Sequence, residues 1–320
     1  MRLRRHRQRA PRAQTAPAWA PGISILIPEW DNAGELAACL DGVREAAREW
    51  TEPIEIVVVV NGSPESDYAA LRRAHPEAGW QFHARPLGFT GAIRAGLRTV
   101  RHDWVYLLNS DVVLERAALG ELALLRRGGT FSIASQIVLK DTTRFRDETN
   151  WGALLVEDGL ATIHDWIPQT TQPVPAFYAG GGASLFRTSL LRTLANPRVY
   201  DPFYWEDVEW GWRARKLGYD SWFCPASVAH HTQRSTIGRH YSSENVDRIV
   251  SRNRWLFQLR NFTTAGSLER LMEEIAGAPD EVGDHFLNAA TRWGIARGRW
   301  WNHVAPVTDE EVLAGWARQA

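Results

Sequence analysis

The sequence has few cysteines and no long hydrophobic run. Only two cysteines, Cys39 and Cys224, occur among 320 residues. They lie far apart, so a disulfide framework is not expected and a reducing compartment is indicated. No stretch approaches the roughly 18 apolar residues that a membrane-spanning helix requires, and no apolar segment follows the basic N-terminus, as it would in a secretory signal. These absences predict a cytoplasmic protein.

The chain also lacks an excess of either charge. Lys and Arg together number 37, as do Asp and Glu, so the overall charge indicates no nucleic-acid partner. The exception is the N-terminal segment MRLRRHRQRAPR, which contains no acid. We predict that residues 1–20 form a disordered basic arm that the chemistry does not need. Such an arm could add weak attraction to an anionic membrane surface. The predicted location is therefore cytoplasmic, with or without peripheral contact with the inner face of the membrane.

From Ile23 onward, short apolar runs alternate with segments of helical periodicity. ISILIP, IEIVVVV, WQFHA and DWVYLLN read as strands, and GELAACLDGVREAAREW, GFTGAIRAGLRTV and ERAALGELALL read as helices. This alternation predicts an α/β fold with a mostly parallel, Rossmann-like sheet flanked by helices. We expect this domain to span residues 21–240, and a helical C-terminal region to follow over residues 241–320.

Polar residues stand where several predicted strands end. Glu29, Asn61 and Asp111 each follow an apolar run, and the carboxyl ends of parallel strands are where such sheets bind ligands. Asp111 interrupts the apolar segment YLLNSDVVL, and an ionised carboxylate without a partner is costly to bury. It could be the N-cap of a helix that starts near Glu115, or it could bind a ligand such as a metal ion.

Three acids crowd the segment FYWEDVEWGWRA, namely Glu206, Asp207 and Glu209. Acids are favoured in the first turn of a helix by its dipole. Aromatic neighbours, however, raise the pKa of a carboxylate and suit a general base. If a helix begins just before Glu206, then Glu206 and Glu209 share one face and Asp207 points elsewhere. Glu209 is then expected to matter mainly for stability.

A pair of histidines, His230 and His231, follows the predicted strand SWFCP. Adjacent residues of an extended chain point to opposite faces, so only one of the two can serve a site. Histidine with a carboxylate is a reasonable ligand set for Mn²⁺, although imidazole is less typical for Mg²⁺. Two glycine-rich stretches, PLGFTGAIRAG and the strand-like segment AFYAGGGASLFR, permit close approach of a phosphate or another ligand, or merely a bulge.

Taken in order, these segments resemble the inverting family 2 glycosyltransferases with the GT-A fold, over roughly residues 23–262. The motifs that carry the resemblance are ISILIPEWDN, IEIVVVVNGSPES, PLGFTGAIRAG, LLNSDVVL, YAGGGASLFRTSLL, FYWEDVEWGWRARKLGY and ASVAHHTQRST. The resemblance implies transfer of a hexosyl or deoxyhexosyl group from a nucleoside-diphosphate sugar to a hydroxyl of a polysaccharide, glycolipid or similar glycan. It also implies a divalent cation, Mn²⁺ or Mg²⁺.

The resemblance further implies roles for individual residues. Asp207 would be the general base, with Glu206 beside it, and the cation would be bound by Asp111 and His230. The nucleotide sugar would be bordered by Pro28, Glu29, Asn61, Arg94, Asn109, Ser110 and Asp111, with Asn109 at the position of the family's first metal-binding acid.

Two other functions are compatible with such a sheet. A nucleotidyltransferase would release pyrophosphate from a nucleoside triphosphate, and a non-catalytic relative would bind glycans through some of the 16 tryptophans. The presence of Asp111, Asp207 and His230 together argues against the non-catalytic relative. Its expected partners are a nucleotide-sugar donor and a glycan or lipid-linked acceptor.

Overall fold

The computed structural model describes residues 20–139, 150–165, 168–195, 199–231, 237–293 and 306–319. The basic arm predicted over residues 1–20 lies outside this part of the chain except for its last residue. No described helix combines the length and apolar character that a membrane crossing requires.

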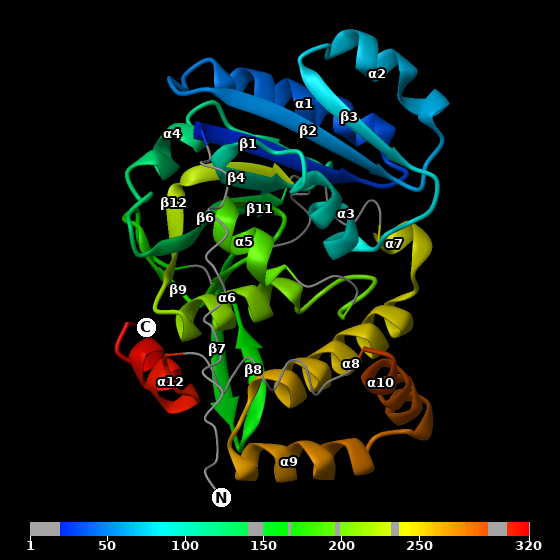
Figure 1. Ribbon diagram of the computed structural model, residues 1–320, viewed down its shortest axis with the longest axis vertical. Helices are drawn as coiled ribbons and strands as arrows, with labels where there is room; N and C mark the ends of the chain where they lie inside the picture. Colours follow the sequence, from blue (N-terminus) through cyan, green and yellow to red (C-terminus); the bar gives the residue numbers. More distant parts are fainter. Residues whose placement is uncertain are drawn as a thin grey trace, which may run out of the picture.

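A mixed sheet forms the centre of the molecule (Figure 1). Strands β3, β2, β1 and β4 run parallel, β11 is antiparallel to β4, and β6 and β12 again run parallel to each other. The predicted α/β fold is therefore confirmed. In sheet order the strands are β3 (Ala78–His83), β2 (Ile54–Asn61), β1 (Ala20–Glu29), β4 (His102–Leu108), β11 (Ala183–Arg187), β6 (Thr130–Leu139), β12 (Asp220–His231) and β5 (Val112–Leu114), with β9 (Val174–Ala176) also paired to β12.

Helices cover both faces of this sheet, as continuous apolar strands require. Side chains of β1 alternate between the two cores: Ile25 and Ile27 enter the one that contains α1 (Ala33–Ala47) and α4 (Ala118–Ala123), and Leu26 enters the other. The second core contains α3 (Phe89–Gly96), α5 (Thr188–Leu194) and α6 (Glu206–Lys216). A short helical stretch, η1 (Glu65–Tyr68) with α2 (Ala69–Ala74), joins β2 to β3.

The segment AFYAGGGASLFR does not form one strand. Its first half ends as β10 (Tyr178–Ala179), which belongs to a separate sheet with β7 (Trp151–Glu157) and β8 (Leu160–His164). Its second half is β11 of the central sheet. The three glycines between the halves connect the two sheets at a place where a Cβ would lie 3.0 Å or less from a neighbouring side chain.

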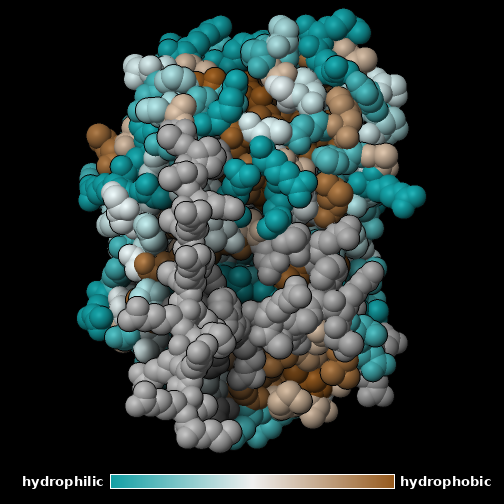
Figure 2. Space-filling model, viewed as in Figure 1, coloured by the Kyte–Doolittle hydropathy of each residue, from teal (hydrophilic) through white to brown (hydrophobic). Residues whose placement is uncertain are grey.

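The C-terminal part is helical, as predicted. It contains α7 (Ile237–His240), α8 (Ser243–Asn261), α9 (Ala265–Ala276), α10 (Asp280–Trp293) and α12 (Asp309–Ala317). Helix α8 packs on α9 and α10, and α12 contacts α6 (Figure 1). On the face shown in Figure 2, hydrophilic side chains dominate the upper part, and apolar colours gather near the bottom, around α9 and α10. These two helices carry the exposed side chains of Met272 and Leu287.

Candidate active site

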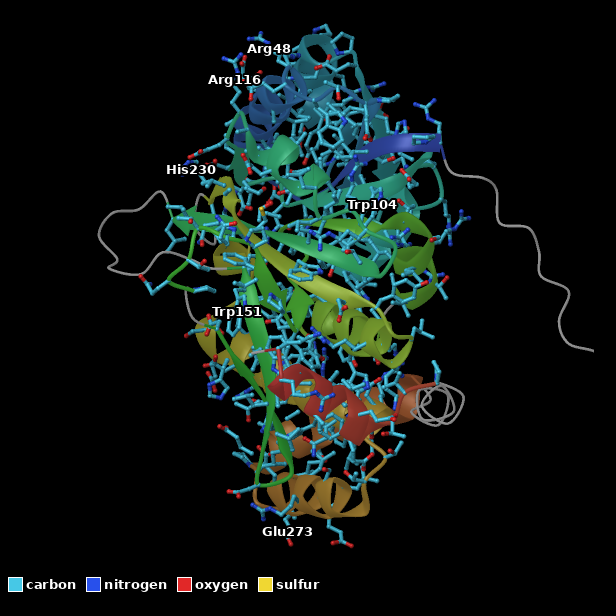
Figure 3. The ribbon with its side chains drawn as sticks, turned by 90° about the vertical axis from the view of Figure 1, so that its left-hand side faces the viewer. Arg48, Trp104, Arg116, Trp151, His230 and Glu273 are labelled. Carbon is cyan, nitrogen blue, oxygen red and sulfur yellow. The ribbon has the colours of Figure 1, made fainter. Side chains whose placement is uncertain are left out.

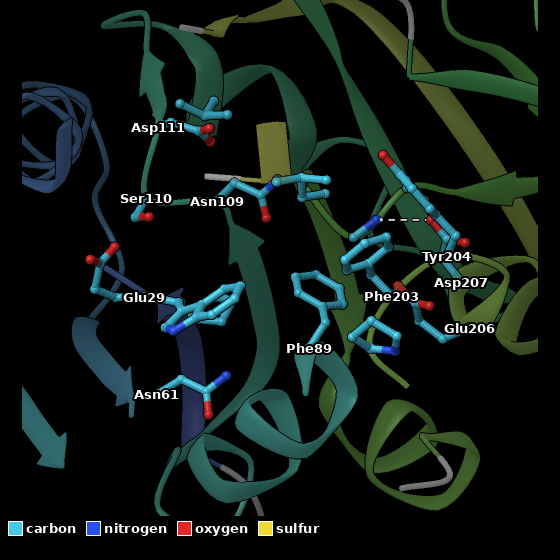
Figure 4. Close-up of a pocket in the computed structure, with 18 of the residues that line it drawn as sticks. Glu29, Asn61, Phe89, Asn109, Ser110, Asp111, Phe203, Tyr204, Glu206 and Asp207 are labelled. Carbon is cyan, nitrogen blue, oxygen red and sulfur yellow. Dashed lines mark hydrogen bonds between the residues drawn. The ribbon is translucent and has the colours of Figure 1, made fainter. Parts of the chain in front are cut away.

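A cavity of about 510 Å³ lies at the carboxyl ends of β1, β2 and β4. Figure 4 shows the residues from these strand ends on one side of the cavity and the segment before α6 on the other, with Phe89 between them. Of the ten site residues predicted from the sequence, eight line this cavity: Pro28, Glu29, Asn61, Asn109, Ser110, Asp111, Glu206 and Asp207.

Asp111 lies in the turn between β4 and β5, and its exposed fraction is 8%. It is not a helix N-cap, because β5 follows it directly and α4 begins only at Ala118. The antiparallel pairing of β5 with β12 places His231 opposite Val112. His231 Nε2 is consequently 3.3 Å from Oδ1 of Asp111, so a carboxylate and an imidazole meet at the cavity wall.

His230 is not the histidine at the site, which corrects one prediction. Its Nε2 lies 2.7 Å from Oε1 of Glu115, and it does not line the cavity. Figure 3 shows His230 at the edge of the molecule, on the same side as Arg116. The alternation of side chains along β12 is the reason, since neighbouring residues of a strand face opposite ways.

Arg94 is also absent from the cavity wall. Its Nη1 donates a hydrogen bond to the carbonyl oxygen of Ala195, at 2.5 Å. Phe89, at the start of the same helix α3, does line the cavity. Arg94 follows Phe89 by five positions, which rotate an α-helix by about 140° beyond one full turn. Arg94 therefore projects from a different side of α3 than Phe89 and does not border a ligand in the cavity.

Glu29 and Asn61 shape the wall opposite α6. Glu29 is fully buried, and its Oε1 accepts hydrogen bonds from the backbone N–H of Asn32 (2.6 Å) and the hydroxyl of Tyr68 (2.8 Å). Burial raises the pKa of Glu29 above its usual value, although its hydrogen bonds oppose the rise. Asn61 Oδ1 accepts a hydrogen bond from the Leu87 N–H at 2.7 Å, which fixes the loop that precedes α3.

The residues around Asp111 fit a divalent cation that is bound together with a phosphate ligand. The carboxylate of Asp111 and the imidazole of His231 supply the oxygen and nitrogen ligands that suit Mn²⁺. No cluster of three or more His, Cys, Asp or Glu side chains that could hold a metal occurs among the described residues. Two protein ligands suffice where phosphate oxygens and water complete the coordination, which is the usual arrangement for Mg²⁺ at nucleotides.

Asp207 lies in the first turn of α6, where its carboxylate is held by backbone donors. Oδ1 accepts a hydrogen bond from the N–H of Val208 (2.8 Å), and Oδ2 accepts one from the N–H of Gly181 (3.3 Å). Burial raises the pKa of Asp207 to about 6, against the effect of these two bonds. The carboxylate is therefore ionised near neutral pH but basic enough to accept a proton.

Glu206 is 4% exposed and adjoins Asp207. Burial, followed by the charges of Asp207 and Asp201, raises the pKa of Glu206 well above its usual value. Two neighbouring carboxyl groups with separated pKa values divide into an acid and a base. Of the two, Glu206 is therefore the group that holds its proton more firmly, which leaves Asp207 as the candidate base.

The triple glycine lets the backbone approach these side chains closely. A Cβ on Gly180 would lie 2.2 Å from Oδ1 of Asn150 and 3.8 Å from Oδ2 of Asp207. A Cβ on Gly182 would lie 3.0 Å from Nδ2 of Asn109. Gly180 and Gly182, which the sequence predicted to allow close approach, thus lie between Asp207 on one side of the cavity and Asn109 on the other.

Glu209, the third acid of the segment, points away from the cavity into a buried ion pair. Its Oε1 lies 2.9 Å from Arg213 and 3.0 Å from Arg260, and it accepts a hydrogen bond from Asn261. The charges of the two arginines overcome the effect of burial and lower the pKa of Glu209 to about 2. Its contribution to stability is therefore present above pH 4.5 and is lost as the pH falls through about 2.

We expect Glu209→Gln to lower the free energy of unfolding by about 3 kcal/mol, because it leaves two buried guanidinium groups without their counter-charge. Urea unfolding at pH 7 measures this change. Glu273→Gln, which removes an exposed acid paired with Arg270, is the matched control and should change stability by less than about 1 kcal/mol. Equal effects of the two substitutions would contradict the structural role of Glu209.

Several cavity residues were not identified from the sequence. Trp30, Phe203 and Tyr241 line the cavity, and Trp30 stacks on His240 of α7 with ring centroids 4.1 Å apart. The aromatic character of the segment before α6 was a usable signal for Phe203. No local pattern links Trp30 to a helix that follows it by about 200 residues, so only the folded chain shows their contact.

Comparison with known proteins agrees with this architecture. The structure of GalNAc-T7 with UDP, GalNAc and Mn²⁺ superposes with a TM-score of 0.54 at 15% identity, covering 92% of this chain and 60% of that one. TarS 1–349 of S. aureus in complex with UDP-GlcNAc gives 0.52 at 14% identity, covering 86% and 74%. At these identities the likeness shows a shared fold, which is the GT-A fold of glycosyltransferases.

Residues 21–257 match the family described as "Glycosyltransferase like family 2". The chain therefore belongs to this family and has the GT-A fold. A curated relative is the undecaprenyl-phosphate 4-deoxy-4-formamido-L-arabinose transferase of Serratia proteamaculans (strain 568), 31% identical over 94 residues. That match covers 28% of this chain and 29% of the Serratia protein.

Proposed function

We propose that this protein moves a hexosyl or deoxyhexosyl group from a nucleoside-diphosphate sugar to a hydroxyl of a glycan or lipid-linked acceptor. The reaction is metal-dependent and inverts the configuration of the transferred sugar. One observation carries the proposal: the carboxylate and imidazole of Asp111 and His231, and the buried carboxylate of Asp207, line the same cavity from opposite sides.

In this reaction Asp207 accepts the proton of the acceptor hydroxyl, whose oxygen then attacks the sugar carbon as the bond to the diphosphate breaks. The backbone N–H groups of Gly181 and Val208 keep the carboxylate oriented. Asp111 and His231 would hold the divalent cation, which, when bound, stabilises the negative charge on the departing diphosphate. A single displacement inverts the sugar, and no covalent intermediate with the enzyme is required.

The descriptions of similar proteins support the kinds of donor, cation and acceptor in this proposal. GalNAc-T7 is described with UDP and Mn²⁺, TarS with UDP-GlcNAc, and the Serratia protein as a transferase for undecaprenyl-phosphate. These descriptions favour a nucleotide-sugar donor, a divalent cation and a lipid-linked acceptor here as well. We place the reaction in the cytoplasm, with a lipid-linked acceptor reached from the inner face of the membrane.

A screen of nucleotide sugars with Mn²⁺ and Mg²⁺ tests the proposal. A donor present at 100 times its Kd should stabilise the fold by about 2.7 kcal/mol, which a thermal shift detects, and slow hydrolysis of that donor should release the nucleoside diphosphate. Release of pyrophosphate from a nucleoside triphosphate would instead indicate a nucleotidyltransferase. Glycan binding without hydrolysis, unchanged by Asp207→Asn, would indicate a non-catalytic relative.

Turnover is expected to depend on pH through Asp207. Because the base must be ionised and its pKa is about 6, kcat/KM should rise about tenfold per pH unit below pH 6 and level off above it. A pH profile of kcat/KM checks this, with circular dichroism at each pH to show that the fold persists. A kcat/KM that falls as the pH rises from 5 to 7 would contradict the assignment.

A further inference from the structure

A second hollow, of about 430 Å³, adjoins the active-site cavity. Residues that line it include Tyr241, Asn245, Arg248 and Arg252, and it shares Pro202 and Tyr241 with the cavity. We call this hollow the α8 groove, because most of the residues that line it belong to helix α8. A molecule that extends from the cavity past Tyr241 and Pro202 would enter the α8 groove.

The α8 groove carries two arginines on one face of a helix. Arg248 and Arg252 are four residues apart, so their side chains are neighbours on α8. The exposed fraction of Arg252 is only 7%. Arg248 is 37% exposed and pairs with Glu244, which is 74% exposed. An exposed pair of this kind contributes little to stability, so an anionic ligand can replace Glu244 at Arg248.

One acid, Asp201, also borders the α8 groove. Its carboxylate is directed towards the start of α3, since a Cβ placed on Gly88 would lie 2.3 Å from its Oδ1. The carbonyl oxygen of Asp201 accepts a hydrogen bond from Arg252. Nε and Nη2 of Arg252 also donate hydrogen bonds to Oδ1 of Asn253. Arg248 therefore supplies the guanidinium donors for a ligand in the groove and Arg252 adds positive charge beside it, while the carboxylate of Asp201 lies on the side of α3.

Helix α8 also fixes the segment that leads to the catalytic carboxylates. Nδ2 of Asn253 donates hydrogen bonds to the carbonyl oxygens of Tyr200 (3.0 Å), Phe203 (2.9 Å) and Tyr204 (2.9 Å). Glu206 and Asp207 follow this segment directly. A group bound to the arginines of α8 is therefore held at a fixed position relative to the proposed base.

We propose that the α8 groove binds a phosphate group of the acceptor and so directs the acceptor's hydroxyl towards Asp207. A guanidinium group such as that of Arg248 binds phosphate through paired, charge-assisted hydrogen bonds, and the positive charge of Arg252 on the same face adds to the attraction. The role in positioning the acceptor rests on the proposed function, whereas the affinity for phosphate does not. The phosphate could belong to a lipid headgroup or to a phosphorylated sugar in solution.

Binding of two probes to the whole chain tests this proposal, with a chelator present so that no cation bridges a phosphate to Asp111. One probe is glucose 1-phosphate, followed by calorimetry, and the other is phosphatidic acid in phosphatidylcholine vesicles, followed by sedimentation. Arg248→Gln should raise the Kd for the phosphate-bearing probe about tenfold, because a charge-assisted hydrogen bond is lost. Arg252→Lys, which keeps the charge of the more buried residue, should raise Kd by a smaller factor.

Arg254→Gln is the matched control. Arg254 lies on the same helix but pairs with Glu274 and does not line the groove, so its loss should change Kd less than twofold. An effect of Arg248→Gln on one probe alone still supports the proposal and identifies the source of the phosphate. Equal effects of Arg248→Gln and Arg254→Gln on Kd, or no binding of either probe to the unmodified chain, would overturn the proposal.

The donor screen separates this proposal from the proposed function. If phosphate binding depends on Arg248 but no nucleotide sugar is hydrolysed, the glycosyltransferase reaction assigned to the cavity fails and the phosphate site stands. If a donor is hydrolysed but phosphate binding does not depend on Arg248, the acceptor site fails alone.

Discussion

Replacement of Asp207 by asparagine is expected to lower turnover by about 10²–10⁴-fold, the usual contribution of a positioned general base. Asparagine has nearly the same shape, but its single amide oxygen can accept a hydrogen bond from only one of the two N–H groups, Gly181 or Val208, and it cannot take a proton at neutral pH. Donor affinity should remain nearly unchanged, because the base meets the acceptor and not the diphosphate. Steady-state kinetics measure the turnover, and calorimetry with a non-transferable donor analogue measures the affinity.

Glu206→Gln is the control for this prediction. Because burial and the charges of Asp207 and Asp201 favour the uncharged form of Glu206, an uncharged amide should replace it with a much smaller loss of turnover. If Glu206→Gln abolishes turnover while Asp207→Asn does not, the base is misassigned by one residue. If both variants retain turnover, the single displacement itself is wrong for this protein.

Asp111→Asn should lower turnover by a comparable amount, about 10³-fold, because a cation at a departing phosphate contributes several kcal/mol of stabilisation to the transition state. The amide has no negative charge to attract the cation, and the amount of Mn²⁺ needed for half-maximal activity should rise. Turnover measured against Mn²⁺ concentration gives both quantities. Full activity of the unmodified protein in excess chelator would refute metal dependence.

The two histidines provide a matched pair for the same prediction. His231→Gln removes the imidazole next to Asp111, so it should weaken Mn²⁺ binding and turnover. His230→Gln removes a side chain that pairs with Glu115 outside the cavity, so it should leave both nearly unchanged. The opposite order of effects would restore His230 as the cation ligand.

The sheet and the strand-end residues could be predicted because they depend on local patterns. Continuous apolar runs identified the parallel strands, and the rule that such strands end at one edge brought Glu29, Asn61 and Asp111 together in advance. The cluster of acids among aromatic residues likewise identified the start of α6. In each case the sequence signal and the structural cause are only a few residues apart.

The remaining features of the site depend on tertiary contacts. Alternation along a strand showed that only one of the two histidines can face the site. Which one does so depends on the register between β12 and β5, a tertiary contact that the local sequence does not define. The direction of Arg94 depends on where α3 begins. The contact of α7 with Trp30 joins segments that lie far apart in the sequence, so no local stretch of sequence contains both.

Tyr204 and Trp205, which precede the proposed catalytic carboxylates, have left-handed backbone conformations, with φ angles of 74° and 76°. Such conformations cost about 1–3 kcal/mol each for residues other than glycine, so this protein keeps a locally unfavourable turn where it holds Glu206 and Asp207. Selection of variants for heat resistance alone would favour residues that relax this turn. Selection for turnover would retain it, and the two kinds of laboratory evolution should therefore diverge first at these positions.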